Sequence, residues 1–214
     1  MGNTHIFTKG EEIANSITHG IGALLSIVAL VFLAILSTVH GNVWHIVSFI
    51  IYGITMLLLY TSSTFVHALP AGRGKNVFEI LDHSSIYFFI AGTYTPFLFT
   101  VLNGPIGWTL FGIVWGIAVI GTIFKCFFVK KFIYTSTLLY VLMGWLIVIA
   151  WKPLSEALHP TALTALVIGG ILYTVGAIFY VWRGFKFHHA IWHVFVLFGS
   201  AAHFTAVLYL LPAS

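Results

Sequence analysis

The sequence predicts an all-α, polytopic membrane protein: a bundle of seven transmembrane helices with the N-terminus in the cytoplasm and the C-terminus outside. The 214-residue chain is 60% hydrophobic and 7% charged, whereas soluble domains carry about 45–50% apolar and about 25% charged residues. Apolar runs of about 20 residues, the length of a membrane-spanning helix, recur along the chain. Positive charges gather in alternate loops, which also indicates a membrane topology.

Short polar or turn-forming segments separate the apolar runs. PAGRGK at 70–75 and NGP at 103–105 are two of these breaks, and their Gly and Pro residues favour turns. Helices are expected, because a membrane barrel would show alternating segments of about ten residues. There is no internal repeat, so the simplest organisation is a single domain over residues 1–214. The predicted spans are Ile17–Val39, Val43–Leu69, Val77–Leu102, Ile106–Phe124, Phe132–Trp151, Thr161–Val181 and Ala190–Leu211.

The basic residues determine the predicted orientation. Lys152 lies alone on one side, and the other lysines and arginines precede span one or follow spans two, four and six. The positive-inside rule places that richer side, with the N-terminus, in the cytoplasm, and an odd number of spans then places the C-terminus outside. The N-terminal region lacks the pattern of a signal peptide. We therefore expect a multi-pass protein of the inner (plasma) membrane.

Polar side chains from different spans are predicted to share one membrane depth. His67 ends span two, Asp82 begins span three, and His189 and His193 begin span seven, all on the cytoplasmic side. His189 and His193 are four residues apart, so they share one helix face at roughly 6 Å. Three imidazoles are the ligand set of catalytic zinc, which activates a bound water at neutral pH. Asp82 could hold that water as a base or orienting group, and Ser63 could hydrogen-bond to the water or to Asp82.

Interhelical hydrogen bonding is the alternative role for each histidine in such a bundle. The segment EEIANSITHG favours a helix start with Asn15 as its cap, although Glu12 and His19 could instead lie beside the site. The single cysteine, Cys126, excludes an intrachain disulfide and a multi-cysteine metal site. We expect the hydrogen-bonding role for three histidines: His83, His188 and His203.

Four segments, EEIANSITHGIG, SSTFVH, LDHSSIYFFIAGTYTPF and HHAIWHVFVLFGSAAHF, occur in an order that resembles the hemolysin III family. That family is the bacterial branch of the progestin and adipoQ receptors, which include the adiponectin receptors, and the resemblance covers nearly the whole chain. It implies seven transmembrane helices, a cytoplasmic N-terminus and a zinc ion held by His67, His189 and His193. It also implies that Asp82 contacts zinc through water and that Ser63 accompanies His67 in a Ser-x-x-x-His motif. The chain lacks the long N-terminal region of the animal receptors, which argues against hormone reception.

The function predicted first is zinc-dependent hydrolysis of a lipid amide or ester near the cytoplasmic side. The family's resemblance to alkaline ceramidases points towards ceramide-like amides, and the expected partners are membrane lipids and no nucleic acid. One alternative is a non-enzymatic sensor or regulator of membrane lipids with a structural zinc. Another is cytolysis, which the family name suggests. A transporter is less favoured, because its polar residues would line a path rather than share one depth. The natural substrate and the oligomeric state stay open.

Overall fold

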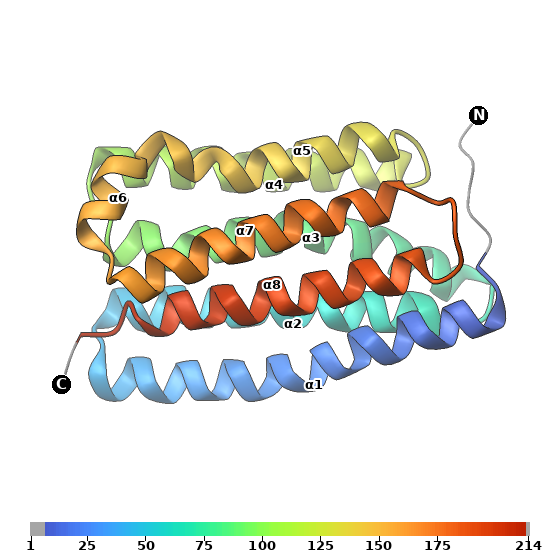
Figure 1. Cartoon of the computed structure of the whole chain (residues 1–214), viewed down its shortest axis with the longest axis horizontal. Helices are drawn as coiled ribbons and strands as arrows, with labels where there is room; N and C mark the ends of the chain where they lie inside the picture. The colour runs from blue at the N-terminus through green and yellow to red at the C-terminus, as the bar shows by residue number, and fades with distance from the viewer. Residues whose placement is uncertain (1–6, 213–214) are drawn as a thin grey trace.

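The regular structure of residues 7–212, the part of the chain that the computed structural model describes, is entirely helical. The helices run side by side along the long axis of the molecule, and α1 begins at the end opposite to that where α8 stops (Figure 1). The elements are α1 (Lys9–His40), α2 (Val43–Ala68), α3 (Arg73–Thr100), α4 (Pro105–Phe128), α5 (Ile133–Trp145), the 3₁₀ helix η1 (Leu146–Ala150), α6 (Trp151–Ala157), α7 (Pro160–Val181) and α8 (His188–Leu208).

Six helical segments in the described part of the chain are long and apolar enough to cross a membrane, which confirms a polytopic, all-α membrane protein. One of the six is the continuous stretch from α5 through η1 to α6. Helix α3 is not among them, although its 28 residues are long enough. Its first half carries Arg73, Lys75, Glu79 and Asp82, which make α3 more polar than the six apolar segments.

The start of α1 differs from the prediction. The helix begins at Lys9, about two turns before the predicted Ile17. Thr8 is its N-cap: the Thr8 hydroxyl accepts from Glu11 N, and the Glu11 carboxylate accepts from Thr8 N at 2.9 Å. This reciprocal capping box satisfies two backbone donors at the helix start. The predicted cap, Asn15, is therefore wrong, because Asn15 lies fully buried inside the helix.

The predicted span Phe132–Trp151 is interrupted by η1. Pro153 follows it, and a proline removes a backbone donor and clashes with the carbonyl four residues earlier, so an α-helix does not continue smoothly into it. Tyr94 from α3 satisfies backbone groups at the break: its hydroxyl donates to Met143 O at 2.9 Å and accepts from Ile147 N at 2.8 Å. The break therefore carries no cost in unpaired backbone groups at these positions.

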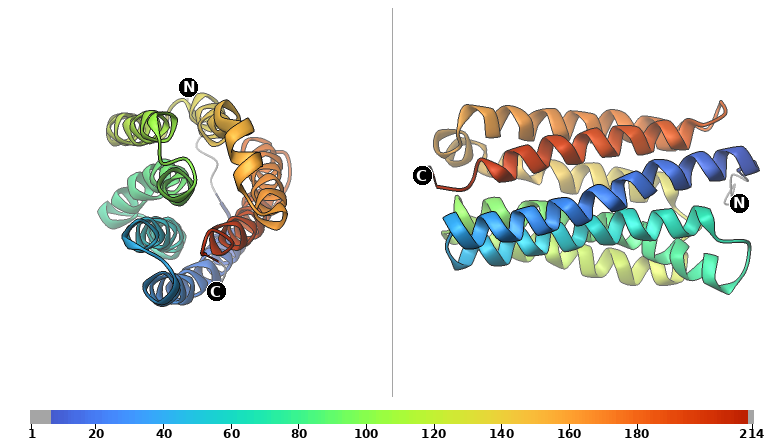
Figure 2. Two further views of the ribbon diagram at one scale, coloured as in Figure 1. Left: turned by 90° about the vertical axis from the view of Figure 1, so that its left-hand side faces the viewer. Right: turned by 90° about the horizontal axis from the view of Figure 1, so that it is seen from below.

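The first and last helices close the bundle. Helix α1 packs against both α2 and α8, α2 packs against α3, and α7 packs against α8, and the view along the axis shows α1 beside α8 (Figure 2). Large apolar side chains cover much of the outer surface, as expected where lipid is the solvent. Small residues allow close helix contacts: a Cβ on Gly169 of α7 would lie 2.1 Å from Cδ2 of His203 on α8.

The order of the helices brings distant segments to one end of the molecule. Helices α1, α3 and α8 begin there and α2 ends there (Figure 1). This end therefore collects the polar starts of three helices and the last turn of a fourth. All the candidate site residues lie on these four elements.

Candidate metal centre

The structure brings the three predicted histidines together. His67 comes from the last turn of α2, and His189 and His193 come from the first two turns of α8. A nitrogen from each lies within 4.8 Å of the other two, and all three side chains are buried. The separation of the ring centroids is 5.1 Å for His67 and His189, 5.4 Å for His67 and His193, and 4.6 Å for His189 and His193. We call this group the histidine triad.

The free nitrogen atoms of the triad fit a metal. In all three rings Nε2 is buried and has no hydrogen-bond partner within residues 7–212. The Nδ1 of His67 lies 2.6 Å from Glu12 Oε2, and the Nδ1 of His193 lies 3.2 Å from Asn15 O. A carboxylate or carbonyl oxygen accepts only, so each Nδ1 carries the proton and each Nε2 presents a lone pair. Unpaired buried acceptors cost about 1–3 kcal/mol each, and a divalent cation that prefers imidazole, such as zinc, would relieve this cost.

Helix α1 supplies residues around the triad that the sequence did not place with certainty. Besides the bond from Glu12, the Thr18 hydroxyl oxygen lies 3.0 Å from Nδ1 of His193. The ring of His19 stacks on His193, with centroids 3.4 Å apart and planes 11° from parallel. The segment does lie at the start of α1, with Glu11 and Glu12 in the first turn as expected for a helix start, but His19 also lies beside the triad, which was the alternative prediction. A stripe of small or polar residues on the buried face of α1, at the spacing of a helix, was the available signal: Asn15, His19, Gly22 and Ser26.

Asp82 lies in the first half of α3, and Ser63 lies four residues before His67 on α2. Asp82 is 5% exposed and Ser63 is fully buried. The Oδ1 of Asp82 and the Oγ of Ser63 have no hydrogen-bond partner in the described part of the chain. The other carboxylate oxygen, Oδ2, lies 3.8 Å from Nδ1 of His83. The carboxylate is not a member of the close group of nitrogen atoms, so the arrangement does not present it as a fourth direct ligand.

The three histidines for which interhelical hydrogen bonding was expected do form such bonds, which confirms that role. His83 bonds through Nε2 to the hydroxyl of Tyr180 at 3.1 Å. The other two bond to backbone carbonyls: His188 to Phe179 O at 3.2 Å and His203 to Leu166 O at 3.1 Å.

The start of α8 is braced by α1. The side chain of Glu11 accepts from Phe187 N at 3.1 Å, two residues before His189. Phe187 has a left-handed backbone with φ of 61°, a conformation that costs a bulky residue roughly 1–2 kcal/mol. Phe7 lies against the ring of His189, with centroids 5.0 Å apart. Nothing in the sequence pattern pointed to Phe187, because local preferences oppose its conformation.

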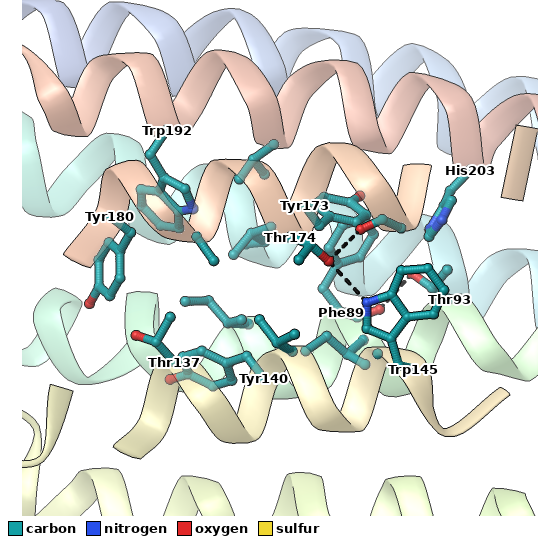
Figure 3. A pocket seen from close by; sticks show the side chains of 18 of the residues that line it. Phe89, Thr93, Thr137, Tyr140, Trp145, Tyr173, Thr174, Tyr180, Trp192 and His203 are labelled. Carbon is teal, nitrogen blue, oxygen red and sulfur yellow. Dashed lines mark hydrogen bonds between the residues drawn. The ribbon is translucent and has the colours of Figure 1, made fainter. Parts of the chain in front are cut away.

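Two cavities lie near the triad. An apolar cavity of about 130 Å³ lies inside the bundle, where Trp192, Tyr180 and Tyr140 line one part and Trp145 and His203 line another (Figure 3). A second, more polar cavity of about 290 Å³ opens at the end of the bundle where α1 and α8 begin; we call it the vestibule. His67 and His189 of the triad line the vestibule. His19, whose ring stacks on His193 of the triad, lines the apolar cavity.

Tyr180 lies on the boundary between the two spaces, because its side chain lines both of them. Its hydroxyl is held by His83, and its ring packs against Trp192 with centroids 4.6 Å apart. Tyr180 thus separates an apolar interior from the more polar vestibule, which His67 and His189 line. This arrangement suits a reaction centre for a molecule with one apolar and one polar part.

Comparison with known proteins supports the resemblance seen in the sequence. Residues 7–204 match the family described as Haemolysin-III related. The chain is 57% identical over 204 residues to a Hemolysin-3 homolog of Bacillus subtilis (strain 168), covering 95% of this chain and 96% of that protein. It is 55% identical over 205 residues to Hemolysin-3 of Bacillus cereus, covering 95% and 94%. It is 30% identical over 203 residues to the human Monocyte to macrophage differentiation factor, covering 92% and 83%. Together with its apolar helices, these matches show that the chain belongs to the haemolysin III-related family and is a multi-pass protein of the plasma membrane.

Proposed function

We propose that this protein is a zinc-dependent hydrolase that cleaves an amide or ester bond of a membrane lipid. The observation that carries the proposal is the histidine triad, two of whose rings line a vestibule that meets an apolar cavity at Tyr180. The apolar cavity suits a hydrocarbon chain, since ligand sites are mostly apolar with a few placed polar groups. The vestibule suits the polar part of the lipid and the water that hydrolysis consumes.

The proposed topology has seven spans: the six apolar segments and, third in chain order, α3. The six apolar segments support six crossings, and α3 lies between α2 and α4 in the chain and packs against both. Its polar first half lies at the end where the vestibule opens, so its charged residues would face the vestibule or the membrane surface rather than lipid. The positive-inside rule makes this end cytoplasmic. The C-terminus would then lie outside the cell.

We assign the Nε2 atoms of His67, His189 and His193 as the zinc ligands. A zinc ion, when bound, supplies a Lewis acid that polarises a carbonyl and acidifies water. Asp82 would then accept a hydrogen bond, and in the reaction a proton, from the attacking water through its free Oδ1. Ser63 would donate its hydroxyl hydrogen to that carboxylate and hold it in place. Glu12 would fix the ring of His67 through the bond at Nδ1.

A second function is favoured by the same geometry: a lipid sensor or regulator with a structural zinc. The triad joins the end of α2 to the start of α8, so a metal there would fasten two helices that are distant in the sequence. This alternative predicts metal-dependent stability without turnover. Cytolysis, which the name Hemolysin-3 suggests for the relatives, predicts dye release from liposomes that does not depend on the triad.

The test begins with the metal content of the purified protein, measured by mass spectrometry. We expect about one zinc per chain in the wild type and in His40→Ala, a control at the exposed far end of α1, and none in His189→Ala/His193→Ala. Fatty-acid release from a panel of lipid amides and esters then follows for the wild type and Asp82→Asn. Release that needs zinc and is lost in Asp82→Asn supports the hydrolase. Zinc without release over the whole panel contradicts the hydrolase and favours the sensor, and no zinc in the wild type contradicts both.

A further inference from the structure

We propose that Lys75 is a positioning residue for the candidate metal centre, acting through Glu12. Lys75 holds one oxygen of the Glu12 carboxylate, so that the other oxygen stays against the Nδ1 of His67 and aims its Nε2 at the metal position. The proposal rests on the proposed metal site, and it adds a residue at the start of α3 to those that orient the metal ligands.

The chain of contacts is short and linear. The Nζ of Lys75 donates to Glu12 Oε1 at 2.7 Å. The Nδ1 of His67 donates to Glu12 Oε2 at 2.6 Å. The two oxygens of one carboxylate are thus divided between an ammonium and an imidazole. These residues come from the starts of α1 and α3 and the end of α2.

Burial explains why the carboxylate needs a second partner. His67 is 6% exposed in its side chain, whereas Glu12 is 24% and Lys75 is 27% exposed, and all three line the vestibule. A half-buried glutamate with a single partner has other rotamers open to it that turn the carboxylate into the vestibule. Charge-assisted hydrogen bonds at both oxygens restrict those rotamers. His67 then keeps one ring orientation and one tautomer.

The expected effect is on metal affinity rather than on folding. Partly exposed ion pairs contribute little to stability, since water screens them. Partners that orient a metal-bound histidine are different: their loss typically weakens metal binding by about 10–100-fold. Lys75 acts one step further away, so its loss should fall at or below the lower end of that range.

The competing explanation is an ordinary ion pair at the end of a helix. The vestibule offers a matched comparison, because Lys130 lies 3.3 Å from Glu79 there. Within residues 7–212, the side chain of Glu79 forms no bond to a histidine of the triad. Its backbone carbonyl oxygen accepts from Nδ1 of His83, which lies outside the triad. If vestibule ion pairs affect the metal only through general electrostatics, removing Lys130 should act like removing Lys75.

The experiment measures zinc dissociation constants by competition with a chromophoric chelator, on the purified full-length chain in nanodiscs. We expect Glu12→Gln to bind zinc about 10–100-fold more weakly and Lys75→Met to bind it about 3–10-fold more weakly than the wild type. Lys75→Arg, which keeps a donor for the carboxylate, and Lys130→Met should stay within about twofold of the wild type. Glu12→Gln/Lys75→Met should be no weaker than Glu12→Gln alone, because Lys75 acts only through the carboxylate.

Three results would each overturn the proposal that Lys75 acts on His67 through Glu12. These are wild-type zinc affinity in Lys75→Met, an equal loss of affinity in Lys130→Met, and additive losses in the double variant. A wild type that binds no zinc would contradict the metal site itself. In that case the nuclear magnetic resonance signal of the proton on Nδ1 of His67 still tests whether Lys75 positions His67 through Glu12. It should be protected from exchange in the wild type and in Lys130→Met but not in Lys75→Met, and equal protection in Lys75→Met would refute the proposal.

Discussion

Removal of zinc from the purified protein should lower its melting temperature by about 5–11 °C. The perturbation is dialysis against a chelator, followed by a check that the zinc content has fallen. The physical reason is that the metal binds the folded chain and not the unfolded one, which stabilises the fold by about 2.7 kcal/mol at a zinc concentration 100 times the dissociation constant. For a chain of about 150–250 residues, each kcal/mol corresponds to about 2–4 °C, which yields the stated range.

The structure supports this magnitude independently. Without a metal, the three Nε2 atoms of the triad are buried polar atoms with no hydrogen-bond partner in the described part of the chain. Each such atom costs about 1–3 kcal/mol, so the triad costs about 3–9 kcal/mol when empty. Water entering from the vestibule would relieve part of that cost, because His67 and His189 line this space. The stabilisation of about 2.7 kcal/mol expected from zinc binding is therefore close to the lower end of the cost of the unpaired nitrogen atoms, about 3 kcal/mol.

Intrinsic fluorescence is a suitable assay, since Trp192 lies beside the triad. The centroid of its ring system is 4.8 Å from that of His189 and 5.1 Å from that of His193. The variant His189→Ala/His193→Ala is the control, and its melting temperature should not respond to the chelator. If verified removal of zinc left the wild-type melting temperature unchanged, the triad would not be a metal site that contributes to the fold, and the reasoning from unpaired nitrogen atoms would be wrong.

Gly169→Ala should destabilise the protein by about 1–3 kcal/mol, because the new Cβ would lie 2.1 Å from Cδ2 of His203. A thermal melt beside Gly116→Ala, where nothing lies within 4 Å of the added carbon, measures the difference, and equal melts would contradict the packing argument. Lys125→Met should stabilise the protein by about 1–3 kcal/mol, since the amine is buried without a hydrogen-bond partner among the described residues; a lower melting temperature would show that the amine has an acceptor. Tyr180→Phe should lower the free energy of unfolding by about 0.5–1.5 kcal/mol, because the hydroxyl bond to Nε2 of His83 is lost. An unchanged melting temperature would show that this bond does not contribute.

The candidate site was predictable to the extent that it depends on helix order and on spacing within a helix. His189 and His193 share a face because they are four residues apart, and His67 reaches them because the spans alternate in direction. Glu12 and His19 were not assigned with certainty. Their neighbours in the sequence resemble a helix start, and only the packing of α1 between α2 and α8 shows which face of that helix is buried.

One local prediction failed and one, a span confirmed within Ile133–Ala157, was incomplete, for related reasons. Asn15 is a good capping residue by type, but Thr8 and Glu11 form the cap earlier in the chain and leave Asn15 inside the bundle. The span Phe132–Trp151 looked like one helix from its hydropathy, whereas Pro153 and the hydroxyl of Tyr94 from another helix make the 3₁₀ segment stable there. Both outcomes depend on partners outside the local window.

The sequence by itself determined the membrane class, the family, the approximate limits of the helices and the shared depth of the histidines. These properties follow from the transfer of apolar segments into lipid and from the placement of basic loops, which act locally along the chain. Only the tertiary structure decided that the nitrogen atoms of the triad face one another, that Glu12 joins His67 to Lys75, and that an apolar cavity and a vestibule meet at Tyr180. The reason is that the rotation of each helix about its axis is set by side-chain packing against several neighbours at once, and a pattern read along one segment does not contain that information.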